Sequence, residues 1–284
     1  MDVMISRRKL LSLAAAAAPL VRLKAARKQM PIGIQLYSVR GELRKDLNAT
    51  VTAVAKMGFD GVEFYAPYFE WDAARAKEVR TLLDGLGLKC FSTHNSAKAF
   101  EAASLPKAIE LNHILGSQSV VMAHPGKVEG GESGWKKVAE NLNKASDILK
   151  PAKLSAGYHN HNPEFRPIDG GKSPIAILTA NTVKAVKLQL DVANCLDSGG
   201  DPVAFLRQNA GRVESLQVKD WTSEGGKAYR VILGDGIGKW GAIFDAAESV
   251  GGARYYLIEQ EECDHPQMEA AKLSLDAFRK LHGA

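Results

Sequence analysis

From Pro31 onward, short runs of β-branched and apolar residues alternate with longer runs that repeat apolar residues at helical spacing. The short runs predict eight strands, at 31–37, 61–65, 88–94, 119–124, 154–160, 187–191, 213–219 and 255–259. Between them, 47–57, 73–86, 135–149 and 243–250 have the period and the Ala, Lys and Glu content of helices. Strands that alternate with helices form βαβ units, whose strands are parallel.

Eight such units without a Pro-, Gly- or Ser-rich linker most simply close into a (β/α)8 barrel, or TIM barrel. The chain has 284 residues, and a barrel takes about 250. We therefore expect one α/β domain at 30–284. A doubly wound open sheet is the alternative, but the turn after the first strand has no Gly-rich phosphate-binding pattern and no Walker-type loop occurs.

The first 29 residues predict an export signal and not a part of the barrel. Met1 to Lys9 is short and basic, and 10–21 is apolar and rich in alanine. A dozen or so apolar residues fall short of the roughly 20 that span a bilayer, so we expect no permanent membrane span. The Arg7-Arg8 pair before the apolar run resembles the twin-arginine signal read by a bacterial export receptor. We therefore expect a periplasmic protein exported by the twin-arginine machinery, with a general secretory signal as the alternative.

The charge of the chain argues against a nucleic-acid partner. The formal net charge is +5, and the first 28 residues contribute seven Lys and Arg against one acid, Asp2. The remainder is therefore near neutral, at about −1, and lacks the basic excess of nucleic-acid binders. Cys90, Cys195 and Cys263 are too few and too scattered for a disulfide framework or a zinc ribbon.

Polar side chains stand at the carboxyl end of nearly every predicted strand. In a barrel, the loops at these ends build the pocket. A single histidine at such a place is usually packed and hydrogen-bonded, but charges buried at so many strand ends require partners or a metal. The residues are Gln35, Tyr37, Glu63, Tyr65, His94, Asn95, His124, His159, Asn160, His161, Asp191, Asn194, Gln217, Lys219, Asp220, Glu259 and Glu261.

Several of these strand ends lie in segments that resemble the sugar phosphate isomerase/epimerase family of xylose-isomerase-like barrels. The segments are 34–40, 58–63, 157–161, 189–194, 218–220, 234–236 and 256–260. Each is weak alone, but their order and spacing together are specific, and the likeness covers nearly all of 31–282. The resemblance implies a small-molecule sugar or keto-sugar as substrate.

The resemblance also implies a divalent cation held by Glu, Asp, His and Glu at the ends of strands five to eight. Asp191 and Glu259 match this pattern, whereas His159 stands at the first carboxylate position and Gln217 at the histidine position. The predicted metal ligands are therefore His159, Asp191, Gln217 and Glu259. Manganese is the expected ion, with zinc, cobalt, iron or magnesium as alternatives.

Two other arrangements of this site stay open. Gln217 offers only a neutral amide oxygen, so the site is alternatively weakened or empty. A rearranged site would use His161 or Glu164.

A site of this kind supports proton transfer next to a carbonyl, in an isomerase, an epimerase or an enzyme that eliminates from 3-keto-glycosides. Glu259 is the predicted base, with His159 or His161 as its acid partner. Lys219 is predicted to polarise a substrate oxygen, and Asp220 is a candidate to neutralise it.

The remaining polar strand ends are predicted to bind the sugar. His94, His124 and His161 are placed to hydrogen-bond hydroxyl groups, with packed core histidines as the alternative. Glu63 is either a pocket acid or a partner of another site residue.

Two further functions are alternatives to the enzyme. A non-catalytic periplasmic sugar-binding barrel is compatible with the weak ligand at Gln217. A three-zinc endonuclease barrel would need more His and Glu ligands and a basic groove, which the near-neutral remainder lacks. The stretches 125–134 and 220–227 could be lids or contacts of a homo-oligomer.

Overall fold

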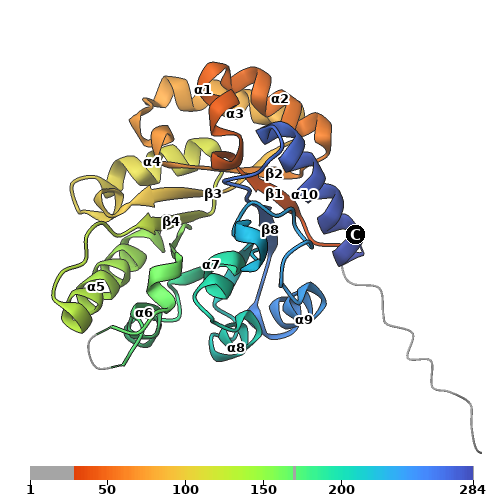
Figure 1. The fold of residues 1–284 in the computed structure, drawn as a ribbon. Coiled ribbons are helices and arrows are strands. Elements are labelled where there is room, and N and C mark those ends of the chain that lie inside the picture. Colours follow the sequence, from red (N-terminus) through yellow and green to blue (C-terminus); the bar gives the residue numbers. More distant parts are fainter. Residues whose placement is uncertain (1–28, 169–170, 284) are drawn as a thin grey trace, which may run out of the picture.

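Eight parallel strands close into a barrel surrounded by helices in the computed structural model, which describes residues 29–168 and 171–283 (Figure 1). Each strand pairs with the next, and β8 pairs with β1 so that Ile34 lies opposite Ile258. The predicted barrel is confirmed, while the predicted export signal lies outside the described residues except for Gln29. The strands are β1 (Ile32–Gln35), β2 (Gly61–Phe64), β3 (Lys89–Ser96), β4 (Ser119–His124), β5 (Ser155–His159), β6 (Lys187–Asp191), β7 (Val213–Val218) and β8 (Tyr255–Ile258).

Helices follow the strands and form the outer layer. The α-helices are α1 (Arg40–Lys45), α2 (Leu47–Met57), α3 (Ala73–Leu86), α4 (Leu105–Leu115), α5 (Gly131–Leu149), α6 (Pro174–Asn181), α7 (Val192–Asp197), α8 (Pro202–Gln208), α9 (Trp240–Ala246) and α10 (Gln267–His282). Short 3-10 helices are η1 (Leu36–Val39), η2 (Ala66–Glu70), η3 (Ala97–Phe100), η4 (Asn162–Phe165) and η5 (Glu224–Gly226), and η6 (Ala247–Gly251) is a π-helical turn. The helix predicted at 243–250 is thus α9 continued by η6.

Local signals set the ends of the helices that pack around the first strands. The Asp46 carboxylate accepts the Ala49 N–H at 2.9 Å where α2 begins, and Asp72 accepts the Arg75 N–H at 2.7 Å where α3 begins. Gly58 ends α2 in the left-handed region, with φ of 93°, a conformation that glycine adopts without a steric penalty.

The two faces of the barrel wall differ in chemistry because strand residues alternate in direction. Residues that face the helices, such as Ile34, Val62, Leu190, Leu216 and Tyr256, are fully buried in the apolar core. The intervening residues point into the barrel, and there Gln35, Glu63, Gln189 and Gln217 hydrogen-bond one another from four strands. The apolar core therefore lies between the strands and the helices, while the interior toward the carboxyl ends is polar.

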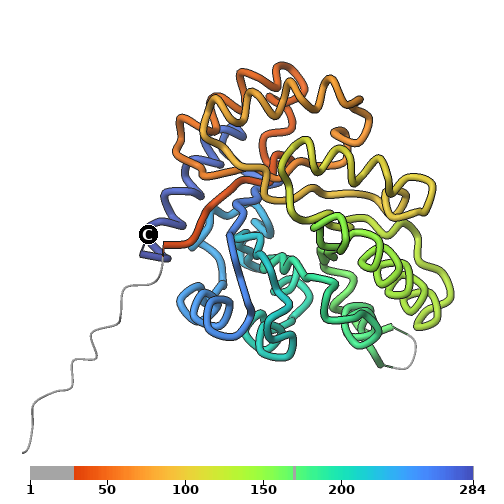
Figure 2. The backbone as a smooth tube through the Cα atoms, turned by 180° about the vertical axis from the view of Figure 1, so that it is seen from behind, coloured from red at the N-terminus to blue at the C-terminus, as the bar shows by residue number. Residues whose placement is uncertain are grey.

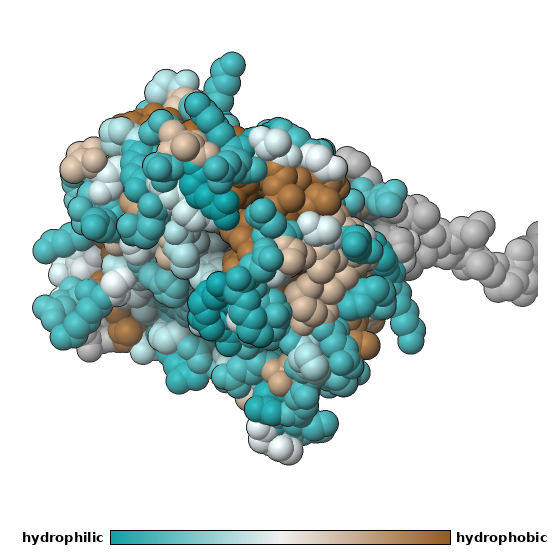
Figure 3. Space-filling view, turned by 90° about the horizontal axis from the view of Figure 1, so that it is seen from above, coloured by the Kyte–Doolittle hydropathy of each residue, from teal (hydrophilic) through white to brown (hydrophobic). Residues whose placement is uncertain are grey.

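The last helix closes the ring beside the first described residues, as Figure 2 shows from behind. Gln267 in α10 accepts the Gly41 N–H at 2.9 Å, and Arg279 donates to the Gly58 carbonyl at 2.8 Å. From above, hydrophilic side chains cover most of the surface, with smaller apolar patches between them (Figure 3). Among the described helices, none combines the length and the apolar character that a membrane crossing requires.

Candidate active site

A cavity of about 160 Å³ opens where the carboxyl ends of the strands meet. Its lining is Tyr37, Tyr65, Ala66, His94, His124, His159, His161, Glu259 and Glu261. Larger cavities lie elsewhere, and the two largest, of about 530 and 670 Å³, lie at the amino-terminal end of the barrel and beside α6 and α8. Neither contains a residue predicted for the site, so we place the candidate site in the smaller cavity.

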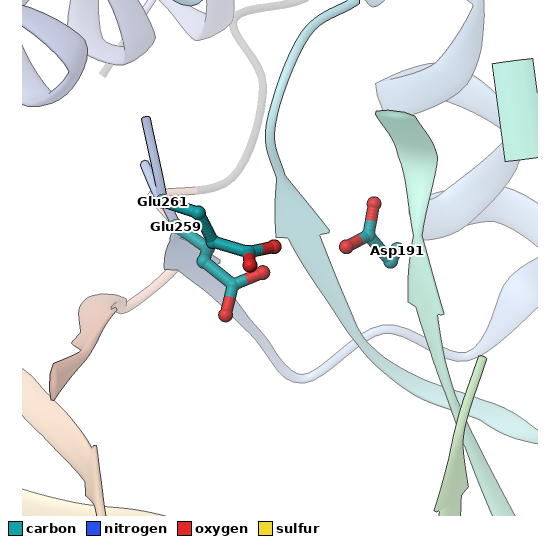
Figure 4. Close-up of side chains that lie close together, drawn as sticks. All are labelled: Asp191, Glu259 and Glu261. Atoms are coloured by element: carbon teal, nitrogen blue, oxygen red, sulfur yellow. The ribbon is translucent and has the colours of Figure 1, made fainter. Parts of the chain in front are cut away.

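Beside this cavity lies a cluster of three carboxylates around one ammonium group, and two of the carboxylates, Glu259 and Glu261, line the cavity. Lys219, directly after β7, is 1% exposed, and its Nζ lies 2.8 Å from Asp191 Oδ2, 2.9 Å from Glu259 Oε2 and 2.5 Å from Glu261 Oε1. Figure 4 shows the three carboxylates, Asp191 from β6 and the two glutamates from the end of β8, turned toward a common space. We call these four residues the lysine-carboxylate cluster.

Burial and mutual charge set the protonation of this cluster. Burial raises the pKa of Glu259, and Glu261 and Asp191 add to this, while Lys219 opposes it. Burial also raises the pKa of Asp191. Burial alone would lower the pKa of Lys219, but the three carboxylates outweigh it and hold that pKa well above its usual value. Lys219 is therefore charged, and Glu259 is a carboxylate that binds a proton more readily than an exposed one.

Two hydrogen bonds from Asn194 fix the orientation of Asp191. Its Oδ1 accepts the Asn194 N–H at 2.9 Å at the start of α7, and its Oδ2 accepts the Asn194 side-chain amide at 2.7 Å. The Asp191 carboxylate is thus held by Asn194 as well as by Lys219.

Glu63 lies beneath the cavity, fully buried, and does not line it. It accepts hydrogen bonds from Gln35 at 2.7 Å, from Gln189 at 2.8 Å and from Gln217 at 3.3 Å, and also from Ser92. His94 Nε2 lies 3.0 Å from Glu63 Oε1 and 2.5 Å from Gln189 Oε1. Both neighbours are acceptors, so Nε2 carries the proton. Of the two roles predicted for Glu63, the geometry matches a partner that orients His94.

Four histidines form the wall of the cavity opposite the carboxylates. The rings of His94 and His159 are 4.6 Å apart, those of His159 and His161 4.9 Å, and those of His161 and His124 5.2 Å. Burial lowers the pKa of His161 to about 4, and it lowers that of His159 well below its usual value and that of His124 below it. His124, His159 and His161 are therefore neutral imidazoles near pH 7, each able both to donate and to accept hydrogen bonds.

Asp220 has a different role from the one proposed for it. Its carboxylate accepts the N–H groups of Gly234, Gly236 and Gly238 and the indole N–H of Trp240, the last at 2.7 Å. It therefore secures the loop after β7, and Lys219 is neutralised by residues from β6 and β8.

Two contacts of Lys219 were not assigned from the sequence. Glu261 follows Glu259 by two residues, the spacing at which extended residues face the same side, so a signal for it was present. Tyr229 places its ring 5.3 Å from Nζ and donates its hydroxyl to Asp197 at 2.6 Å. It lies in an irregular loop, where no periodicity points to it.

The donors of the cluster are ones that a divalent cation accepts. Asp191, Glu259 and Glu261 each offer an oxygen within 4.8 Å of the others. The Lys219 ammonium, however, lies among these same carboxylates, so an ion bound there would have to replace it. His159 Nδ1 and Gln217 Oε1, on two of the four predicted ligands, have no hydrogen-bond partner among the described residues. Glu164 is engaged elsewhere, by the Tyr158 hydroxyl and the His161 N–H. The predicted four-residue metal shell stays a prediction.

The comparison with known proteins agrees with the barrel fold. Residues 51–281 match the pattern of the xylose isomerase-like TIM barrel family. The chain belongs to this family. A similar structure is that of a sugar phosphate isomerase/epimerase from Parabacteroides distasonis, with 25% identity, a TM-score of 0.74, and coverage of 91% of this chain and 96% of that one.

Two other proteins are similar at lower sequence identity. An inosose dehydratase from Clostridium perfringens is 23% identical over 189 residues, which are 61% of this chain, and the match spans 63% of that relative's length. The structure of IOLI protein with a binding zinc atom has 15% identity and a TM-score of 0.68, covering 89% of this chain and 98% of that one. At that identity the likeness concerns the fold.

Proposed function

We propose that this protein abstracts a proton next to the carbonyl of a sugar or keto-sugar, as an isomerase, an epimerase or a dehydratase. The observation that carries the proposal is Glu259, a carboxylate buried in the wall of the cavity with a raised pKa beside the Lys219 ammonium. A general base for carbon acids works best when its pKa approaches the working pH. The names of the relatives, a sugar phosphate isomerase/epimerase and an inosose dehydratase, describe reactions of this class.

The proposed step begins when the Glu259 carboxylate takes the proton from the carbon beside the carbonyl. The electron pair of that C–H bond forms the carbon–carbon double bond of an enediolate, and the carbonyl π pair moves onto oxygen. For an isomerisation, the hydroxyl proton on the original carbon passes to the former carbonyl oxygen and the abstracted proton returns to the former carbonyl carbon. For an epimerisation, a proton returns to the opposite face of the original carbon. Expulsion of a β-hydroxyl or β-alkoxyl group, as the enediolate oxygen reforms the carbonyl and the proton on Glu259 passes to the leaving oxygen, completes an elimination.

The cavity favours a neutral, single-ring substrate. Its volume of about 160 Å³ is small, and the described residues that line it include two glutamates and no Lys or Arg. A phosphate group would meet two carboxylates here, and the nearby Lys219 ammonium is already paired with three. The histidine wall instead offers donors and acceptors to hydroxyl groups. We therefore propose an unphosphorylated sugar, keto-sugar or cyclic polyol ketone.

Metal dependence is a separate expectation, drawn from the resemblance. A divalent ion, manganese by that expectation, would be held by His159, Asp191, Gln217 and Glu259 and would act as a Lewis acid on the carbonyl oxygen. The proton transfer described above needs no such ion, because the Lys219 ammonium already supplies a positive charge between Asp191 and Glu259.

The test follows solvent deuterium into a panel of 3-keto-glycosides and plain ketoses incubated with the protein. We expect incorporation at the carbon next to the carbonyl, and a loss of at least about a hundredfold in Glu259→Gln, the scale of a removed general base. Glu262→Gln, an exposed neighbour, is the matched control and should exchange as the wild type does. Binding of the sugars without exchange would favour the non-catalytic sugar-binding barrel.

A further inference from the structure

We propose that the Lys219 ammonium is the resident cation of this site and takes the place of the divalent ion that the resemblance implies. Its role toward substrate rests on the proposed function, whereas its role as the bound cation rests on contacts alone. The consequence is a xylose isomerase-like barrel whose chemistry is independent of metal.

The contacts of Nζ use its whole donor capacity. A lysine ammonium has three N–H donors and no acceptor, and the structure gives it three carboxylates at 2.8, 2.9 and 2.5 Å. The side chain is 1% exposed. A buried ammonium is stable only with such pairing, and each carboxylate in turn has the charge partner that its burial requires.

The strand order places the lysine between the carboxylates. In the barrel, β7 pairs with β6 on one side and β8 on the other. Asp191 ends β6, and Glu259 and Glu261 follow β8, so a side chain that leaves the end of β7 inward passes between them. A divalent ion would need these carboxylate oxygens at about 2.0–2.6 Å. Ion and ammonium would then occupy the same space with the same sign of charge, so only one of them can be bound.

The two departures from the family pattern agree with this exchange. His159 replaces a carboxylate with an imidazole, a ligand that brings no negative charge to balance a divalent ion. Gln217 replaces a histidine with an amide whose Nε2 is directed to Glu63 at 3.3 Å. Both changes weaken the binding of an ion, and neither weakens the binding of a lysine that brings its own charge.

Glu261 is the partner of Lys219 that a substrate can replace. Its side chain is 39% exposed, against 6% for Glu259 and 0% for Asp191, and it lines the cavity. A carbonyl oxygen that displaces Glu261 would accept one N–H of the ammonium, which would then stabilise the enediolate oxygen while Glu259 holds the proton.

The test titrates Mn²⁺ into the chelator-treated protein and measures free Mn²⁺ by electron paramagnetic resonance. We expect no Mn²⁺ site in the wild type at concentrations up to about 1 mM. Lys219→Ala should gain one site per chain, at least about a hundredfold tighter, because removal of the ammonium leaves three facing carboxylates. Lys219→Ala combined with Asp191→Asn should lose that site again, and Lys187→Ala, a lysine at the opposite end of β6, should behave as the wild type.

Two results would overturn the proposal. One is a stoichiometric, tight Mn²⁺ site in the wild type that Asp191→Asn removes, because the ion would then displace the ammonium. The other is a folded Lys219→Ala variant that binds no Mn²⁺. If Lys219→Ala fails to fold by circular dichroism, Lys219→Met, which keeps most of the side-chain volume, replaces it, and the wild-type titration still decides the first point.

Deuterium exchange by the chelator-treated wild type separates this proposal from the proposed function. Exchange that persists without metal supports both. Absence of exchange with and without Mn²⁺ contradicts the proposed reaction but leaves the titration result standing. Exchange that appears only with Mn²⁺ contradicts the ammonium as the working cation and supports the reaction.

Discussion

Glu63 connects the interior of the barrel to the cavity through His94. The carboxylate accepts hydrogen bonds from side chains on β1, β3, β6 and β7. One of these is His94, whose Nε2–H is thereby fixed, so that a neutral ring has its other nitrogen as an acceptor. His124 differs, since it is exposed and is stacked on His161.

This difference predicts different effects of removing each ring. His124→Ala should raise KM by roughly fivefold, the equivalent of one hydrogen bond of about 1 kcal/mol, with little change in kcat. Its urea denaturation midpoint should match that of the wild type. His94→Ala should raise KM as well and should also lower the midpoint, because Glu63 and Gln189 lose a buried partner. If His124→Ala unfolds instead, it is a packed core histidine and not a sugar contact.

Part of the candidate site could be predicted from the sequence. The carboxyl end of a parallel strand is recognisable from the end of its apolar run, so Asp191, Glu259 and the four histidines were expected to share a pocket. The partners of Lys219 were not predictable, because they depend on how neighbouring strands are staggered around the barrel. Asp220, adjacent in sequence, was the natural candidate, yet its carboxylate is directed to the glycine-rich loop.

The loop that follows β7 has little regular structure and is held mainly by one side chain, that of Asp220. Asp220 Oδ1 and Oδ2 accept backbone N–H groups from Trp221, Gly234, Gly236 and Gly238. A Cβ at position 236 would lie 2.3 Å from Asp220 Oδ1, so glycine is required for this close approach. The Asp220 carboxylate therefore binds both ends of this loop. The same loop places the Tyr229 ring next to Lys219.

Asp220→Ala should release the loop. We expect the free energy of unfolding to fall by about 3 kcal/mol, because several buried N–H groups lose a charged acceptor. Amide hydrogen exchange at 221–239 should accelerate while exchange in the strands changes little. Asp235→Ala, in the same loop and exposed, is the matched control. Equal protection of the loop in both variants would contradict the role assigned to Asp220.

In the whole molecule, the candidate site and the first described residues lie at opposite faces of the barrel. β1 runs from Ile32 toward the cavity, so the first described residues lie at the opposite, amino-terminal face. The segment that precedes them joins the barrel away from the active site.

We propose that this segment directs export of the folded protein through the twin-arginine machinery. Replacing Arg7 and Arg8 together by lysine should leave the protein in the cytoplasm, because the receptor reads paired guanidinium groups and lysine does not reproduce them. Cell fractionation with an antibody against the barrel measures the outcome. Undiminished periplasmic protein in the double variant would contradict the twin-arginine assignment and favour a general secretory signal.

The positive charge among the carboxylates belongs to the side chain of Lys219, which the gene encodes. Each polypeptide carries the positive charge of its site from the moment of translation, at a ratio of one per chain that no chelator or competing ion can alter. Nutrient supply, metallochaperones and the order of export and loading therefore have no influence on how many molecules possess it. Only mutation of Lys219 can remove it.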